Sequence, residues 1–143
     1  MIAPTLAKQL KEAGLVWDPQ LHDFFMVPEP NLEDRVFVLA DLQAYLELYQ
    51  GRPVVTFHGT AEWALDYILQ SEVIWMPTDA QLREILVGLV PGLVLRHTPP
   101  AGYTCTIRLA GQTVSFAADQ ASDAYGQALL HLMQTQQVDE RVN

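Results

Sequence analysis

The clearest structural pattern in the chain lies in residues 102–134, GYTCTIRLAGQTVSFAADQASDAYGQALLHLMQ. Apolar residues occupy every second position across 103–109, and the same alternation repeats across 112–117. A period of two predicts two strands, each with one buried and one solvated face. Between them, Ala110-Gly111 leaves room for a two-residue turn, because glycine accepts a positive φ at no steric cost. The pattern therefore predicts a β-hairpin.

After the hairpin the period changes to 3.6, beginning at Asp119 or Ser122, either of which can cap a helix. One apolar stripe then follows, made of Ala121, Ala124, Tyr125, Ala128, Leu129, Leu132 and Met133. The alanines in this stripe allow a helix to approach the sheet closely, so we expect a long helix packed on one face of the hairpin. The opposite face is expected to be uncovered and open to pairing; it carries Thr104, Thr106, Arg108, Thr113 and Ser115.

The hairpin 103–116 and the alanine-rich helix 118–133 resemble small α/β/α domains of the phage ABA-sandwich type, which bacteria and their phages encode. In those domains a hairpin strand ending in an aromatic residue leads through an acidic cap to an Ala/Leu helix. The resemblance covers about 30 of the 143 residues. It implies an α/β fold, and it carries no activity over to this chain.

Upstream of the hairpin, short apolar runs alternate with helical patterns. The runs 36–39 and 73–76 are wholly apolar, which predicts strands covered on both faces and therefore central in a sheet. Helices are predicted over 5–13, 42–49, 61–70 and 78–89. Because helices between strands favour parallel pairing by right-handed crossover, some parallel pairs are expected beside the antiparallel hairpin. The predicted fold class is α/β (α+β): a single domain with a mixed β-sheet flanked by helices, and a C-terminal β-hairpin followed by a long helix.

The predicted domain covers residues 1–134, and the polar residues 135–143 are expected to form a flexible C-terminal tail. Two halves, 36–70 and 73–134, share an order of elements. Each begins with an apolar strand, continues with a capped helix and a Gly/Pro stop, and reaches a strand that ends in histidine. A duplication would explain this order, but a chance coincidence of elements also produces it and is the favoured interpretation.

Composition limits the function. Half of the residues are apolar and 17% are charged, with a formal net charge of −9. An acidic chain repels phosphate backbones and anionic lipids, so we expect no nucleic-acid partner and no membrane partner. The N-terminus lacks the apolar core of a signal peptide, and the longest uncharged apolar run, 85–95, is too short to span a bilayer, which predicts a cytoplasmic protein. The single cysteine, Cys105, excludes an internal disulfide and a cysteine-based zinc framework, and no cofactor or metal is expected.

Histidines supply the only candidates for catalysis. His58 and His97 fall at predicted strand ends, where ligand sites of α/β sheets tend to gather. With Asp66 or Glu62 they could form a metal site or an acid/base pair. No two histidines have metal-ligand spacing on a helix, and surface histidines at strand ends are the simpler interpretation. We therefore expect no enzyme.

Apolar side chains outside the regular pattern are the candidates for an interaction surface. They are Trp17, Phe24, Phe25, Met26 and Trp63. Exposed aromatic residues and methionine are enriched at interfaces, although the simpler interpretation is that Trp17 and Phe25 close one end of the core. The predicted function is a non-enzymatic protein-interaction or assembly module with a protein partner or a homo-oligomeric state. The alternative is a small-molecule-binding protein or an enzyme with a site near His58 and His97.

Overall fold

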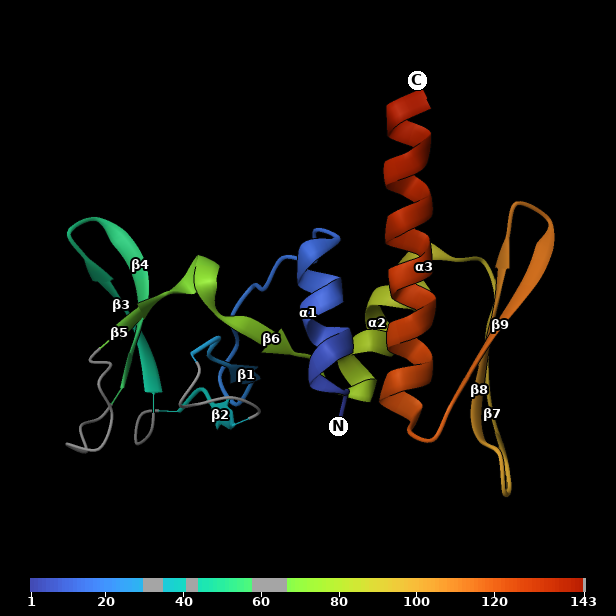
Figure 1. Cartoon of the computed structure of the whole chain (residues 1–143), viewed down its shortest axis with the longest axis horizontal. Coiled ribbons are helices and arrows are strands. Elements are labelled where there is room, and N and C mark those ends of the chain that lie inside the picture. Colours follow the sequence, from blue (N-terminus) through green and yellow to red (C-terminus); the bar gives the residue numbers. More distant parts are fainter. Residues whose placement is uncertain (30–34, 41–43, 58–66, 143) are drawn as a thin grey trace. The chain divides into compact units, whose positions relative to one another are not determined.

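The computed structural model describes residues 1–29, 35–40, 44–57 and 67–142 (Figure 1). Within these ranges the chain forms three α-helices and nine strands, and the strands make three small antiparallel sheets. The chain divides into two compact units. Unit 1 comprises Met1–Val16 and Pro77–Asn143, and unit 2 comprises Trp17–Met76. The predicted mixture of α and β structure, ending in a hairpin and a long helix, is confirmed.

The sheet of unit 1 contains the predicted hairpin. Its strands are β7 (Leu93–Thr98), β8 (Gly102–Leu109) and β9 (Gln112–Ala118), in the order β7-β8-β9. Ala110 and Gly111 have φ angles of 52° and 79°. Two successive positive φ values are the signature of the type I′ turn, whose twist matches that of the strands it joins. The two-residue turn predicted at Ala110-Gly111 is therefore confirmed, with Leu109 paired to Gln112 on either side of it.

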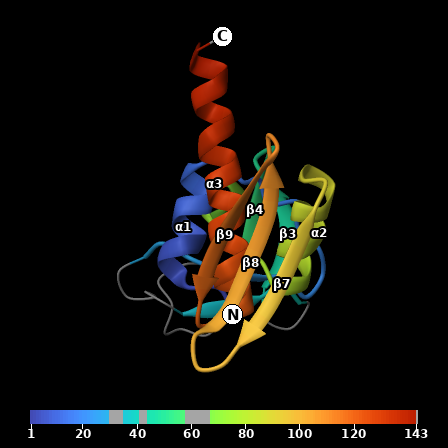
Figure 2. The same ribbon diagram turned by 90° about the vertical axis from the view of Figure 1, so that its right-hand side faces the viewer.

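Helix α3 (Ala121–Val142) covers one face of this sheet. Cys105 and Ile107 of β8 are fully buried, as are Ala124 and Ala128 of the helix, because small side chains let the helix axis approach the strands. Figure 2 shows the other face turned toward the viewer, with α3 behind the strands. Arg108, Thr113 and Ser115 on that face are exposed, and the hydroxyls of Thr106 and Ser115 are 2.9 Å apart.

Two further helices complete unit 1. Helix α1 (Pro4–Glu12) confirms the predicted N-terminal helix and packs against α3. Helix α2 (Asp79–Leu89) begins with the predicted capping box. The backbone N–H of Gln81 donates to Oγ1 of Thr78 at 3.2 Å, and the backbone N–H of Thr78 donates to Oε1 of Gln81 at 2.9 Å. These two bonds satisfy donors that a helix start otherwise leaves unpaired.

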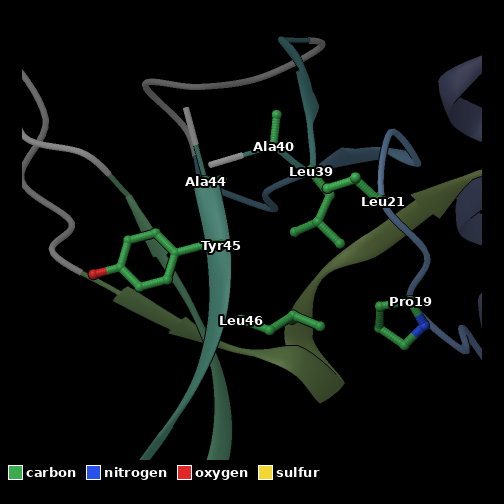
Figure 3. A pocket seen from close by; sticks show the side chains of 7 residues that line it. All are labelled: Pro19, Leu21, Leu39, Ala40, Ala44, Tyr45 and Leu46. Carbon is green, nitrogen blue, oxygen red and sulfur yellow. The ribbon is translucent and has the colours of Figure 1, made fainter. Parts of the chain in front are cut away.

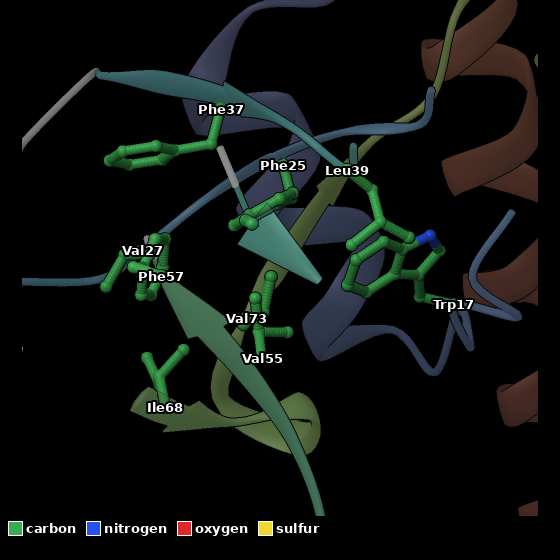
Figure 4. Close-up of a cluster of buried hydrophobic side chains, with 10 residues drawn as sticks. Trp17, Phe25, Val27, Phe37, Leu39, Val55, Phe57, Ile68 and Val73 are labelled. Atoms are coloured by element: carbon green, nitrogen blue, oxygen red, sulfur yellow. The ribbon is translucent and has the colours of Figure 1, made fainter. Parts of the chain in front are cut away.

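Unit 2 is built from two three-stranded sheets around an aromatic core. One sheet has the order β2-β1-β6 and the other β3-β4-β5. The strands are β1 (Phe24–Met26), β2 (Val36–Val38), β3 (Ala44–Tyr49), β4 (Arg52–Phe57), β5 (Tyr67–Leu69) and β6 (Ile74–Met76), with the 3-10 turn η2 (Gln70–Glu72) before β6. Phe57 of β4 joins the sheets, since its ring centroid lies 6.2 Å from that of Phe25 and 5.4 Å from that of Phe37 (Figure 4).

The predicted single sheet with parallel pairs is wrong in its connectivity. Every pairing between described strands is antiparallel, and the strands divide among three sheets. The runs expected at the centre, now β2 and β6, flank β1 instead. Likewise the 103–118 hairpin belongs to a sheet of its own and supplies its central strand, β8. Wholly apolar runs can be buried at the edge of a small sheet when a second sheet covers them.

The helix predicted over 42–49 is also wrong, because 44–49 is strand β3. The apolar residues there fit a helical period and a period of two equally well. The turn decides between them: Gln50 and Gly51 have φ angles of 53° and 80°, the type I′ geometry of the 110–111 turn. Of the helix predicted over 61–70, residues 61–66 lie outside the described ranges and Tyr67–Leu69 is strand β5.

The structure also differs from the predicted C-terminal tail and from the predicted internal duplication. Helix α3 continues to Val142, so residues 135–142 extend a helix where a flexible tail was expected. A strand at 44–49 removes the strand–helix–strand order of the first half. The proposed duplication of 36–70 and 73–134 depended on that order and loses its basis.

Candidate functional site

The aromatic residues expected at an interaction surface lie mostly in the core of unit 2. Trp17, Phe25 and Met26 are buried, and Phe24 is half-buried. Trp63 lies outside the described residues. An accessible binding surface on unit 2 must therefore be sought elsewhere.

The candidate catalytic residues are not brought together by any described contact. His58, Glu62 and Asp66 lie outside the described residues. His97 is exposed on β7, and its ring centroid lies 4.8 Å from that of Tyr103 on the neighbouring strand. His97 belongs to unit 1, whereas position 58 falls in the range of unit 2. A site near His58 and His97 stays a prediction.

The described residues also bear on three other kinds of function: metal binding, membrane insertion and catalysis by cysteine. Within them, no three side chains of histidine, cysteine, aspartate or glutamate gather as a metal site would require. None of the described helices combines the length and the apolar character needed to cross a bilayer. Cys105, the one cysteine, is buried against α3, and burial raises the pKa of its thiol to about 11. At neutral pH this thiol is protonated and therefore a poor nucleophile.

An apolar hollow of about 530 Å³ lies on unit 2 beside the start of β3. Its lining residues are Pro19, Leu21, Leu39, Ala40, Ala44, Tyr45 and Leu46. Figure 3 shows Leu21, Leu39 and Leu46 on one side of β3, with the ring of Tyr45 on the other. A volume of this size lies within the range of sites that hold small molecules or anchoring side chains.

Asp23 fixes the segment that forms one wall of this hollow. Oδ2 of the buried Asp23 accepts hydrogen bonds from Nε1 of Trp17 and from the backbone N–H of Gln20, both at 2.9 Å. Pro19 and Leu21, which line the hollow, lie in the sequence between Trp17 and Asp23, on either side of Gln20. This buried polar contact therefore fixes the segment that supplies Pro19 and Leu21 to the hollow.

Backbone hydrogen bonds tie the same segment to the opposite wall. The N–H of His22 donates to the carbonyl of Leu39, and the N–H of Leu39 donates to the carbonyl of Asp23, both at 2.8 Å. His22 has a φ of 74°, an uncommon conformation for a residue with a side chain. Ala40 and Ala44 then exchange two bonds, at 2.9 and 3.0 Å. The wall is therefore joined directly to β3.

The outer edge of β3 is open beyond Ala44. Pro53 has no N–H, so its pair with Leu48 is a non-hydrogen-bonded pair of the β3–β4 ladder. By alternation the same holds for Leu46 and Ala44, whose backbone groups point away from β4. Ala44 uses these groups to bind Ala40, which confirms the direction. The corresponding groups of Leu46 and Leu48 meet no partner in the described part of the chain.

The side chains at this edge are apolar and accessible. Leu46 and Leu48 lie on the same face of β3 as the buried Ala44, yet they are 41% and 74% exposed. Leu21 across the hollow is 62% exposed. Proteins usually protect edge strands with charged side chains, proline or a bulge. Strand β3 carries one charged residue, Glu47, and neither lysine nor proline. An open edge with few protecting residues, beside an apolar hollow, is the form of a site that accepts an added strand.

Sequence reasoning missed this site because it assigned 42–49 to a helix. Two signals were present: the Gln50-Gly51 pair, and the alternation of Leu46 and Leu48 with the flanking tyrosines and Glu47. An isolated period-two pattern of six residues is too short to outweigh an equally good helical one.

Comparison with known proteins adds no assignment. No protein-family model matches the chain, and searches among curated proteins and among solved structures give no match. The resemblance to phage ABA-sandwich domains stays a prediction.

Proposed function

We propose that this protein is a non-enzymatic interaction module that binds an extended segment of a partner protein at the outer edge of β3. The observation that carries the proposal is the outward direction of the backbone groups of Leu46 and Leu48, next to the apolar hollow. An added strand would gain main-chain hydrogen bonds from the edge, and one of its apolar side chains would enter the hollow.

The expected affinity is moderate. Each backbone hydrogen bond to an added strand contributes about 0.5–1.5 kcal/mol net. Burying a leucine-sized side chain contributes about 1.5–3 kcal/mol. These gains are opposed by the ordering of the bound segment, so a reversible complex is expected. Because the walls of the hollow are already fixed by the hydrogen bonds of Asp23 and Leu39, the ordering cost falls mainly on the partner.

The test uses three acetylated and amidated nine-residue peptides, in which valine alternates with lysine, threonine or glutamate. We expect at least one of them to slow the hydrogen exchange of the Leu46 and Leu48 amides, followed by NMR of the 143-residue chain. Leu48→Pro removes one outward N–H while retaining an apolar side chain, and proline is tolerated at a strand edge. This variant should remain folded and bind at least tenfold more weakly.

A matched control distinguishes binding at the β3 edge from nonspecific binding to exposed apolar side chains. Leu48→Ser should weaken binding, whereas Val94→Ser, which removes another exposed apolar side chain on β7, should leave it unchanged. If none of the three peptides protects the Leu46 and Leu48 amides, the proposal is wrong. Equal losses in the two serine variants would also overturn it.

A further inference from the structure

The charge of the chain is concentrated in one of its two units. Ten acidic and two basic residues give unit 2 a formal charge of −8, whereas seven acidic and six basic residues give unit 1 a charge of −1. The open edge of β3 belongs to unit 2. A long-range field of this sign attracts cationic partners and repels anionic ones.

The β3 edge also carries a local negative charge, the carboxylate of Glu47. Tyr45, Glu47 and Tyr49 occupy the face of β3 opposite Leu46 and Leu48, so a carboxylate lies between two aromatic residues on one strand face. Glu47 is exposed and forms no ion pair or hydrogen bond with the described residues. Arg52, which pairs with Tyr49 across the β3–β4 ladder and lies on the same face, is exposed and forms no ion pair with Glu47.

Aromatic surface extends this face. The ring centroids of Tyr49 and Tyr67 lie 4.8 Å apart, although their strands, β3 and β5, are separated by β4. Both tyrosine residues are about two-fifths exposed. Lysine and arginine side chains bind favourably to the faces of such rings, and a neighbouring carboxylate adds an ionic contact.

We infer that the occupant of the β3 edge is a cationic extended segment in which apolar residues alternate with lysine or arginine. This inference rests on the proposed function. In an added strand, residues opposite Leu46 and Leu48 project onto their apolar face, and the residue opposite Glu47 projects onto the face of Glu47 and the tyrosines. Alternation in the partner thus matches the two faces of β3.

A second copy of this chain fits the edge poorly. Pairing two β3 edges in antiparallel fashion would bring two units of charge −8 together and place Glu47 near its counterpart. Like charges on opposing strands are destabilising. The charge distribution therefore favours a different, basic partner.

The experiment measures dissociation constants of the three nine-residue peptides by calorimetry, alongside the exchange of the Leu46 and Leu48 amides. We expect the lysine peptide to bind at least tenfold more tightly than the threonine peptide at low salt, and the glutamate peptide not to bind. Raising the salt from about 0.05 to 0.5 M should remove most of the tenfold difference, since screening weakens exposed charge pairs.

Paired variants locate the charge effect. Glu47→Gln should weaken binding of the lysine peptide about threefold and leave the threonine peptide unchanged. Glu72→Gln removes an exposed glutamate of the same unit that lies on η2, outside β3, and should have the smaller effect.

The outcomes distinguish this inference from the proposed function. Equal affinity for the threonine and lysine peptides, with protected Leu46 and Leu48 amides, would overturn the cationic partner and leave the binding edge standing. Protection of those amides without peptide, together with a dimer in native mass spectrometry, would identify a second copy as the occupant and overturn the inference. If none of the three peptides binds, both the proposed function and the inference of a cationic partner are wrong.

Discussion

Nε1 of Trp17 donates a hydrogen bond to Oδ2 of Asp23 at 2.9 Å, inside the core of unit 2. The same oxygen accepts the backbone N–H of Gln20, so one carboxyl group holds the segment that walls the apolar hollow. Trp17 also contributes its ring to the aromatic cluster, 5.6 Å from that of Phe25. Stability and the shape of the proposed binding site therefore depend on the same contact.

Trp17→Phe should lower the free energy of unfolding by about 1–3 kcal/mol, because it retains an aromatic ring but leaves Asp23 without its indole donor. Urea unfolding followed by circular dichroism measures the change. Asp23→Asn keeps an oxygen that can accept both bonds, so it should cost less. A Trp17→Phe protein as stable as the parent would show that the bond is unimportant.

The approach of α1 to α3 leaves no room for a side chain at Gly126. A Cβ there would lie 2.7 Å from Cδ2 of Leu6 and 3.2 Å from Cδ1 of Ile2, both buried. Gly126→Ala should destabilise the protein by about 1–3 kcal/mol through overpacking, in spite of the better helix propensity of alanine. Thermal unfolding measures this change.

Gly88 of α2 provides the matched control, because a Cβ there meets nothing within 4 Å. Gly88→Ala should stabilise the protein by about 0.5–1 kcal/mol. Leu6→Ala should also cost less in the Gly126→Ala background than in the parent, since it makes space for the new methyl group. Stabilisation by both glycine substitutions would contradict the close approach of the helices.

Each type I′ turn has one residue that is unfavourable for its conformation. Ala110 has a φ of 52° and Gln50 a φ of 53°, and asparagine tolerates this region better than either. Ala110→Asn and Gln50→Asn should each stabilise the protein by about 0.5–1 kcal/mol. Ala101→Asn, in a turn without a positive φ at that position, should have no such effect in the same unfolding assay.

Cys105 should make stability depend on pH in the alkaline range. Burial raises the pKa of its thiol from 9.0 to about 11, so the folded state keeps a proton that the unfolded state loses. Below pH 9 both states are protonated and the thiol adds no pH dependence. Between pH 9 and 11 the free energy of unfolding should fall, by up to about 1.4 kcal/mol per pH unit.

Cys105→Ala lacks this titration, although it loses packing at every pH. The stability advantage of the parent over Cys105→Ala should therefore shrink when urea unfolding is repeated at pH 8 and at pH 10.5. Parallel pH profiles of the two proteins would contradict the raised pKa.

The sequence by itself determined the elements whose contacts are local. The hairpin and helix of 102–134 follow from periodicity, and the start of α2 follows from the capping box of Thr78 and Gln81, because the interacting residues are neighbours along the chain. The burial of Cys105 followed from the same alternation.

The remaining elements became clear only from the pairing of strands in the folded chain. The pattern at 42–49 fits a helix and a strand, and the pairing of β3 with β4 across the Gln50-Gly51 turn selects the strand. Phe25 likewise becomes the centre of a sheet by pairing with Phe37 and with Trp75, which lies fifty residues away. The open edge of β3 exists because the hairpin with β4 satisfies one side of the strand, while among the described strands none pairs with the other side. Pairings such as that of Phe25 with Trp75 depend on residues that a local pattern cannot compare.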